Sequence, residues 1–111
     1  MLEAPIENSN RVYAKSKGVA FYKFTSPGHR SVPDRLLLSK IPEELRPIVA
    51  KYVQFVEYKA TGKKATEKQL REHARLRNLG FRVNVIDNPE AGELLIDWML
   101  IDEMVWNVKC K

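Results

Sequence analysis

The segment Phe55-Val56-Glu57-Tyr58-Lys59 carries two charged side chains within an apolar run, and this pattern predicts a central strand of a sheet. Side chains alternate between the two faces of a strand, so Glu57 and Lys59 lie on one face, with Val56 and Tyr58 on the other. Charged groups on a central strand are costly unless they are paired or bind a metal ion. The segment therefore predicts a functional site, and the alternative is an ordinary ion pair on an exposed strand face.

A second acid, Asp34, follows Pro33 and precedes the apolar run Leu36-Leu37-Leu38, which predicts a neighbouring strand. Two carboxylates and an ammonium brought to one point suit a hard divalent cation and an attacking water. The alternative is that Asp34 is a turn residue, because Pro-Asp steps are common in turns. The pattern indicates metal-dependent hydrolysis as a hypothesis.

Periodicity and turn residues along the chain predict a small α/β fold. Strands are expected at residues 19–24, 35–39, 52–60 and 81–86, and helices at residues 3–16, 42–51, 66–80 and 90–104. The third strand, the following helix and the fourth strand form a βαβ unit, which requires a parallel pair. We expect one domain over residues 1–111, with a mixed four-stranded sheet flanked by helices.

Composition sets the broad class of the protein. The 111 residues are 44% hydrophobic and 30% charged, which fits one soluble globular domain. A net charge of +5 suits a polyanionic partner, although many other proteins share such an excess. Cys110, the single cysteine, excludes an internal disulfide and argues against a catalytic thiol. With no signal peptide and no apolar run of membrane-spanning length, we expect a cytoplasmic protein without a membrane partner.

Three ordered blocks of sequence resemble the VRR-NUC family of nucleases, a branch of the PD-(D/E)XK superfamily. The first block is KFTSPGHRSVPDRL at residues 23–36, the second runs from Val56 to Lys64, and the third from Gln69 to Asp87. The chain departs from the family at Ser31, where glycine is usual. It departs again at residues 39–52, which are longer than the expected turn.

The resemblance implies a PD-(D/E)XK restriction-endonuclease-like core and a Mg²⁺- or Mn²⁺-dependent endodeoxyribonuclease. It implies that Asp34, Glu57 and the Val56 carbonyl hold the metal, and that Lys59 positions or deprotonates the attacking water. Hydrolysis would leave a 5′-phosphate and a 3′-hydroxyl.

Two further site residues follow from the resemblance. Glu7 in the first helix would assist the metal ligands, with Glu3 one turn away as the alternative; an ordinary solvated acid near a helix N-terminus is the simpler interpretation. Gln69 would direct its amide at the site, whereas the Thr66-Glu67-Lys68-Gln69 pattern explains the same residue as half of a capping box.

Basic residues near these blocks predict contacts with nucleic acid. His29 and Arg30 lie in the loop before Asp34, Lys23 begins the first block, and Lys63 and Lys64 end the second. His73 shares a helix stripe with Gln69, and packing against the sheet with one satisfied nitrogen is the favoured interpretation there. No second histidine has metal-ligand spacing, which argues against a zinc site.

The DNA partner is predicted from the resemblance and from the last helix. The chain has no base-reading module, so recognition by backbone shape and charge is expected. Stand-alone family members resemble Holliday-junction resolvases, which implies a homodimer that cuts four-way junctions. The last helix is apolar on most sides, which favours a homodimer contact or, alternatively, deep burial in the monomer; its apolar residues are Leu94, Leu95, Ile96, Trp98, Met99, Leu100, Ile101, Met104 and Val105. The rival functions are flap, nick or other DNA cleavage, a non-catalytic nucleic-acid-binding module, and a regulatory interaction protein.

Overall fold

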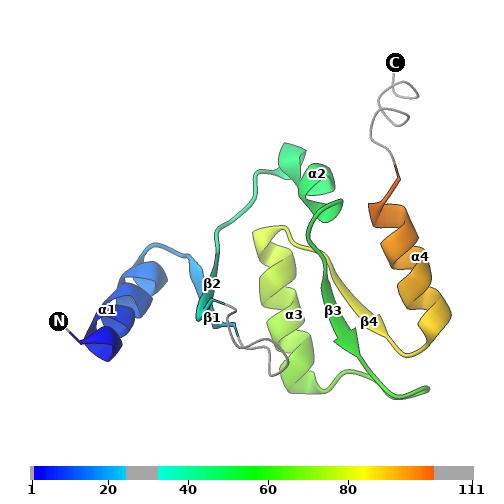
Figure 1. The fold of residues 1–111 in the computed structure, drawn as a ribbon, viewed down its shortest axis with the longest axis horizontal. Coiled ribbons are helices and arrows are strands. Elements are labelled where there is room, and N and C mark those ends of the chain that lie inside the picture. Colours follow the sequence, from blue (N-terminus) through cyan, green and yellow to red (C-terminus); the bar gives the residue numbers. More distant parts are fainter. Residues whose placement is uncertain (1, 25–32, 102–111) are drawn as a thin grey trace. The chain divides into compact units, whose positions relative to one another are not determined.

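The computed structural model describes residues 2–24 and 33–101, and the chain divides into two compact units (Figure 1). The first unit is Met1–Lys40 and the second is Ile41–Lys111. Each unit is described by itself below. The single nuclease domain over residues 1–111 stays a prediction.

The first unit is a helix followed by an antiparallel pair of strands. Helix α1, Glu3–Ser16, has the predicted bounds, and it ends where Gly18 takes a positive φ of 75°. Strands β1, Ala20–Lys23, and β2, Arg35–Leu38, pair in the register Ala20↔Leu38 to Lys23↔Arg35. The Phe24 amide donates to the Asp34 carbonyl at 2.9 Å, so the hydrogen bonding continues one step past the strands and fixes the Asp34 backbone.

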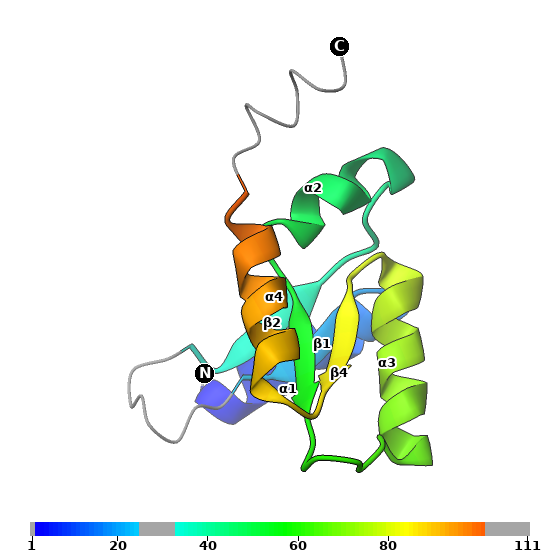
Figure 2. The ribbon, with the colours of Figure 1, turned by 90° about the vertical axis from the view of Figure 1, so that its right-hand side faces the viewer.

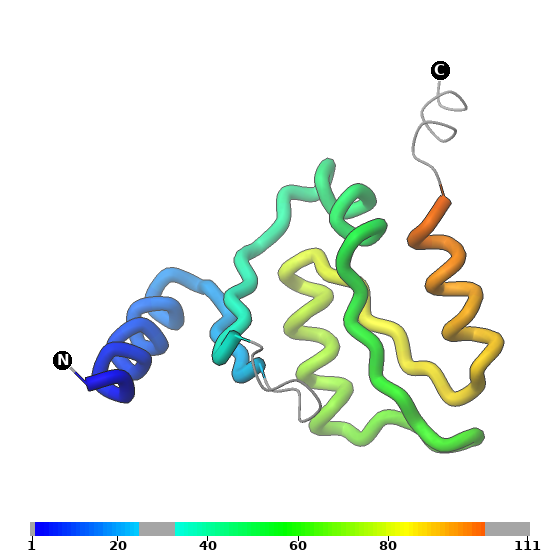
Figure 3. The backbone as a smooth tube through the Cα atoms, in the orientation of Figure 1, coloured from blue at the N-terminus to red at the C-terminus, as the bar shows by residue number. Residues whose placement is uncertain are grey.

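The second unit contains the predicted βαβ motif, which Figure 3 traces along the backbone. Its elements in chain order are η1 Glu43–Leu45, α2 Arg46–Ala50, β3 Phe55–Tyr58, α3 Glu67–Leu79, β4 Val83–Ile86 and α4 Pro89–Met99. Strands β3 and β4 pair in parallel, as predicted, from Phe55↔Val83 to Tyr58↔Ile86. Figures 1 and 2 together show α3 and α4 on opposite faces of this strand pair.

The predicted mixed four-stranded sheet differs from what the described residues form, which is two two-stranded sheets. One is the antiparallel β1–β2 pair and the other is the parallel β3–β4 pair. Both kinds of pairing expected of a mixed sheet are therefore present, but no described ladder joins them. The physical reason is that apolar periodicity identifies strands, whereas the neighbour of each strand depends on the path of the intervening chain.

The largest differences between predicted and observed element boundaries are at β3 and α4. Strand β3 begins at Phe55 rather than at residue 52, because the amides of Lys51, Tyr52 and Val53 donate to carbonyls of α2 and continue its last turn. Helix α4 ends at Met99, and the predicted end near residue 104 lies outside the described residues. No helix in the described ranges is both long enough and apolar enough to cross a membrane.

Helix α3 is bounded by two local signals that were visible in the sequence. Thr66 and Gln69 form a reciprocal capping box at its start, as the pattern predicted. Gly80 ends the helix in the left-handed conformation, with a φ of 104°. Leu76 of α3 is buried, and so are Val83 and Ile86 of β4, the strand that α3 contacts.

A cluster of cations on Trp98 holds the C-terminal end of α4. The Lys51 ammonium lies 4.3 Å from the centre of the indole ring, and the Arg82 guanidinium lies 5.3 Å from it. The same ammonium donates to the Trp98 carbonyl, in the last turn of α4. A cation at a helix C-terminus also interacts favourably with the helix dipole, so Lys51 stabilises this end in two ways.

We predict that Gly80→Ala destabilises the fold more than Gly62→Ala does. Both glycines have positive φ, so an alanine costs about 1–2 kcal/mol at either position. At Gly80 the added Cβ would also lie 2.6 Å from Arg46 Nε, which donates to the Ile41 carbonyl, whereas nothing lies within 4 Å of a Cβ at Gly62. Denaturant unfolding of the two variants measures the difference, and equal losses would contradict the role of Arg46.

Candidate active site

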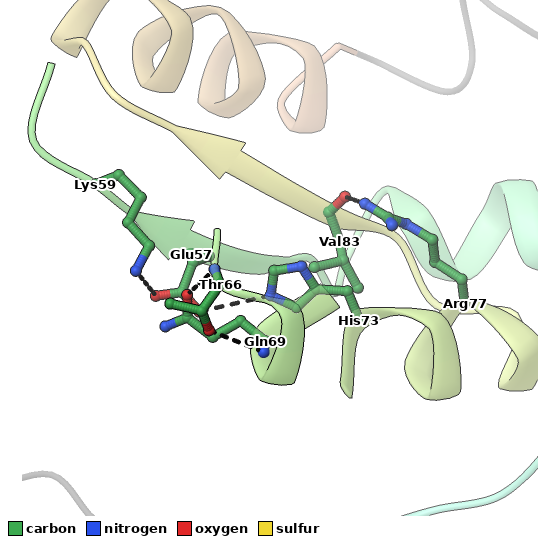
Figure 4. A network of polar contacts seen from close by, with 7 residues as sticks. All are labelled: Glu57, Lys59, Thr66, Gln69, His73, Arg77 and Val83. Atoms are coloured by element: carbon green, nitrogen blue, oxygen red, sulfur yellow. Dashed lines mark hydrogen bonds and ion pairs between the residues drawn. The ribbon is translucent and has the colours of Figure 1, made fainter. Parts of the chain in front are cut away.

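Glu57 and Lys59 lie together on one face of β3, as the strand alternation predicted (Figure 4). Lys59 Nζ is 3.9 Å from Glu57 Oε2, and the two side chains are 19% and 29% exposed. The separation exceeds a hydrogen-bond length. The low exposure means that the Glu57 carboxylate is partly removed from water, and the Lys59 ammonium lies near enough to balance its charge. Because no hydrogen bond joins the two groups, the carboxylate can still accept a further ligand.

The backbone of β3 has one edge that pairs with β4 and a second edge that carries the Val56 carbonyl. In a parallel ladder the amide and carbonyl of one residue point to the same neighbouring strand, and the next residue points the opposite way. The amides of Phe55 and Lys59 donate to carbonyls on the β4 side, at 3.0 and 2.9 Å. The Val56 carbonyl therefore points away from β4, to an edge that pairs with no other strand among the described residues of this unit.

His73 of α3 reaches the same carboxylate from the other side. Its Nε2 lies 3.5 Å from Glu57 Oε1, while the whole residue is only 5% exposed. Packing of His73 against the sheet was the favoured interpretation of the sequence, and its burial agrees with it. Its Nδ1 is buried with no hydrogen-bond partner in the described structure.

Gln69 is occupied by the helix cap. The Thr66 amide donates to Gln69 Oε1 at 3.0 Å, and the Gln69 amide donates to Thr66 Oγ1 at 3.2 Å. The capping interpretation is confirmed, and a catalytic role for the Gln69 side chain stays a prediction. Gln69 is one turn before His73 on α3, so both residues lie on the same side of the helix.

The loop after β3 is fastened to the start of α4 by Asp87. Asp87 Oδ2 accepts the Gly62 amide at 3.0 Å, and its carbonyl accepts the Thr61 hydroxyl at 3.1 Å. Hydrogen bonds from the Asn88 side chain and then from the Gly62 amide lower the pKa of the Asp87 carboxyl. The predicted DNA contacts Lys63 and Lys64 follow this anchor and are exposed.

In the first unit, Glu7 of α1 is paired with Arg35 at the start of β2. Arg35 Nε donates to Glu7 Oε2 at 3.0 Å. This hydrogen bond, with smaller contributions from the charges of Arg35 and Lys23, lowers the pKa of the Glu7 carboxyl. The hydrogen bond to Glu7 also raises the pKa of the Arg35 guanidinium, and the charge of Asp34 raises it further. Sequence reasoning missed Arg35, although a basic residue directly after the Pro-Asp step was a visible signal.

The predicted site residues thus form two groups, one in each unit. Glu57, Lys59 and Gln69 belong to the second unit, and Glu7 and Asp34 to the first, where Asp34 is exposed and Lys23 pairs with Arg35 across the ladder. His29 and Arg30 lie outside the described residues. No three His, Cys, Asp or Glu side chains of the described chain are grouped closely enough to hold a metal ion. A site that joins the two groups stays a prediction.

Comparison with known proteins finds a relative among phage proteins. The chain is 48% identical over 81 residues to "Putative nuclease p44" of Acyrthosiphon pisum secondary endosymbiont phage 1. The match covers 73% of this chain and 76% of the phage protein.

The chain belongs to the family of this phage protein. Because the match spans 81 of 111 residues, any continuous placement of it includes residues 31–81, and so Asp34, Glu57, Lys59 and His73. The p44 relationship therefore covers the central residues of both groups. No protein-family model matches the chain, and no solved structure does.

We predict that Arg35→Gln raises the pKa of Glu7 toward its ordinary value of 4.5. A lowered pKa in the folded chain means that the ion pair stabilises the fold above the unfolded pKa. That contribution is lost as the pH falls through the lowered value. Carbon-13 NMR titration of the carboxyl carbons measures the change.

Asp87 is the control within the same spectra. Its pKa is lowered below 3.8 by Asn88 and Gly62, which the substitution leaves in place. An unchanged Glu7 titration in Arg35→Gln would show that the ion pair does not hold this carboxylate.

Proposed function

We propose that the chain is a metal-dependent DNA endonuclease with a PD-(D/E)XK core of the VRR-NUC type. One observation carries the proposal: Glu57 and Lys59 meet on one face of β3, in a chain whose phage relative is named a nuclease. An acid and an amine at this strand spacing are what the superfamily signature requires. The sequence blocks around Asp34 and Gln69 support the same assignment.

The donor atoms that these residues offer are of the kind that Mg²⁺ and Mn²⁺ prefer. Glu57 keeps an accessible carboxylate beside a loosely placed ammonium, and the Val56 carbonyl points to an unpaired strand edge in the described part of its unit. Asp34, which is exposed in the first unit, would supply a second carboxylate. Oxygen-only ligands favour these ions over zinc or copper. Asp34, Glu57 and the Val56 carbonyl would hold the metal, with Glu7 assisting.

A bound ion of this kind polarises the scissile phosphate and lowers the pKa of a coordinated water. Lys59 orients the attacking water, and its ammonium stabilises the negative charge that develops on the phosphate oxygens. The backbone of Lys59 is held by the hydrogen bond from its amide to the Ile86 carbonyl. The products would be a 5′-phosphate and a 3′-hydroxyl.

Glu7 has to exchange partners if it assists. Its carboxylate is paired with Arg35, so either a ligand displaces the guanidinium or Glu7 acts by holding Arg35 next to Asp34. In the second arrangement, Arg35 would contact a DNA phosphate beside Glu7 and Asp34. In both arrangements Glu7, rather than Glu3, is the helix acid that faces β2.

DNA is held through its backbone in this proposal. Lys23, Lys63 and Lys64 are exposed, and together with His29 and Arg30 they would contact phosphates. The net charge of +5 supports the same partner. Binding of this kind weakens steeply with salt because it releases counterions.

We predict that Lys59→Ala and Glu57→Gln abolish Mg²⁺- or Mn²⁺-dependent DNA cleavage while the chain still folds. Gel assays on labelled DNA with and without metal measure cleavage, and circular dichroism checks the fold. Lys68→Ala is the matched control for charge, since Lys68 lies on the exposed side of α3 and has no place in the site. Cleavage that persists in purified Lys59→Ala would overturn the assignment.

The same assay separates the rival functions. Metal-independent DNA binding without any cleavage would favour a non-catalytic nucleic-acid-binding module. Neither binding nor cleavage would favour an interaction protein that uses α4. A binding module has no need of the Glu57–Lys59 pair, which is why the nuclease is preferred.

The proposed substrate is a four-way DNA junction, cut by a homodimer. Helix α4 exposes Leu94 by 70% and Ile96 by 54%, and the two residues directly after it, Leu100 and Ile101, are 76% and 52% exposed. An apolar surface of this kind favours a second protein surface, and two copies would place two sites for symmetric cuts. Flap, nick and linear DNA are the alternative substrates for the same residues.

We predict that a four-way junction is cut faster than a linear duplex of the same sequence, with symmetric cuts in two opposing strands. Separate end-labels on each strand locate the cuts, and light scattering over a range of protein concentrations gives the mass. Equal rates on junction and linear DNA, or a strict monomer at high concentration, would contradict this part of the proposal and leave the nuclease assignment standing.

A further inference from the structure

The Glu57 carboxylate is approached by a nitrogen group at each of its oxygens. Lys59 Nζ lies 3.9 Å from Oε2, and His73 Nε2 lies 3.5 Å from Oε1 (Figure 4). The two groups come from different elements, since Lys59 follows β3 and His73 belongs to α3. The orientation of the carboxylate is therefore determined by tertiary structure, and not by the strand alone.

Packing does not explain a histidine at position 73. Among the described residues, His73 is the polar side chain that is buried, at 5% exposure, and its helix buries Leu76 on the same side. An imidazole in such a place costs free energy unless its nitrogens are hydrogen-bonded. Nδ1 has no partner in the described structure, so Glu57 is the polar group that favours histidine here over leucine.

The unpartnered Nδ1 also indicates which nitrogen carries the proton. A neutral imidazole has one N–H donor and one acceptor nitrogen. An N–H buried without an acceptor is rarer than an acceptor buried without a donor. We therefore place the proton on Nε2, where it faces the carboxylate, and Nδ1 is left as a buried acceptor without a donor.

We propose that His73 is a positioning residue for Glu57: it donates from Nε2 to Oε1 and so leaves Oε2 as the oxygen that a metal ion would take. This inference rests on the proposed function, because it assigns Glu57 as a metal ligand. The 3.5 Å separation is longer than a formed bond of about 2.9 Å. A small rotation of the carboxylate closes it, and then one oxygen is held by His73 while the other stays available beside Lys59.

A partner that orients a metal ligand commonly contributes about 10- to 100-fold to metal affinity. The contribution of His73 should appear in metal binding before it appears in the chemical step. Lys59 remains in place without His73, so a variant should recover cleavage when the metal concentration is raised. Loss of Lys59 or Glu57 itself should not be recoverable in this way.

The experiment compares His73→Leu with His73→Gln. Leucine fills a similar volume without a donor, whereas the glutamine amide can place an N–H near the position of Nε2. Mn²⁺ binding without DNA is followed by electron paramagnetic resonance, and cleavage is followed over a range of Mn²⁺ concentrations. We expect His73→Leu to bind Mn²⁺ about tenfold more weakly and to regain cleavage at high Mn²⁺, with His73→Gln close to the native chain.

Two results would overturn the inference. One is native Mn²⁺ affinity in His73→Leu, and the other is an equal loss in both variants when circular dichroism shows both to be folded. The leucine variant should be at least as stable as the native chain, because the substitution removes a buried polar group. A loss of Mn²⁺ affinity in this variant is therefore not explained by unfolding.

Nitrogen-15 NMR of the imidazole separates this inference from the proposed function. We expect the Nε2-protonated tautomer in the metal-free native chain, with ring nitrogen shifts that change in Glu57→Gln. The Nδ1-protonated tautomer would overturn the positioning role. If the tautomer is as expected but the native chain binds no Mn²⁺, the nuclease proposal fails while the contact between His73 and Glu57 stands.

Discussion

The parallel ladder between β3 and β4 is the constraint on which the candidate site depends. It fixes the register Glu57↔Val85 and continues beyond the strand, where the Lys59 amide donates to the Ile86 carbonyl. Lys59 is therefore held by the backbone even though it lies past the last strand residue. The same ladder turns the Val56 carbonyl to the opposite edge, so three proposed functional groups take their directions from one set of hydrogen bonds.

Local sequence signals predicted the helices and strands, and they predicted that Glu57 and Lys59 share one face of β3. The alternation in Phe55–Lys59 placed Glu57 beside Lys59, and the Thr66–Gln69 pattern predicted a capping box that is present with both of its hydrogen bonds. These features depend on residues at most three positions apart. Strand and helix geometry alone sets their relative positions, which is why the sequence was sufficient.

Features that depend on distant residues were not predictable in the same way. The ion pair between Glu7 and Arg35 joins a helix to a strand across 28 positions, and the contact between Glu57 and His73 depends on how α3 packs after its crossover. For His73 the sequence predicted burial but not the polar partner. The joining of the two strand pairs into one four-stranded sheet stays a prediction for the same reason, since the strand patterns do not specify which edges meet.

Asp87 has a consequence for how acid affects this protein. One carboxylate holds the loop that leads to Lys63 and also forms part of the turn into α4, through Gly62 on one side and Asn88 on the other. Its lowered pKa keeps it charged, and both attachments in force, at pH values where an ordinary aspartate is already partly protonated. Once it is protonated, the bonds to both sides weaken in a single step. The loop and the start of α4 therefore lose this support at the same low pH, although the loop is proposed to contact DNA and the helix a second copy of the chain.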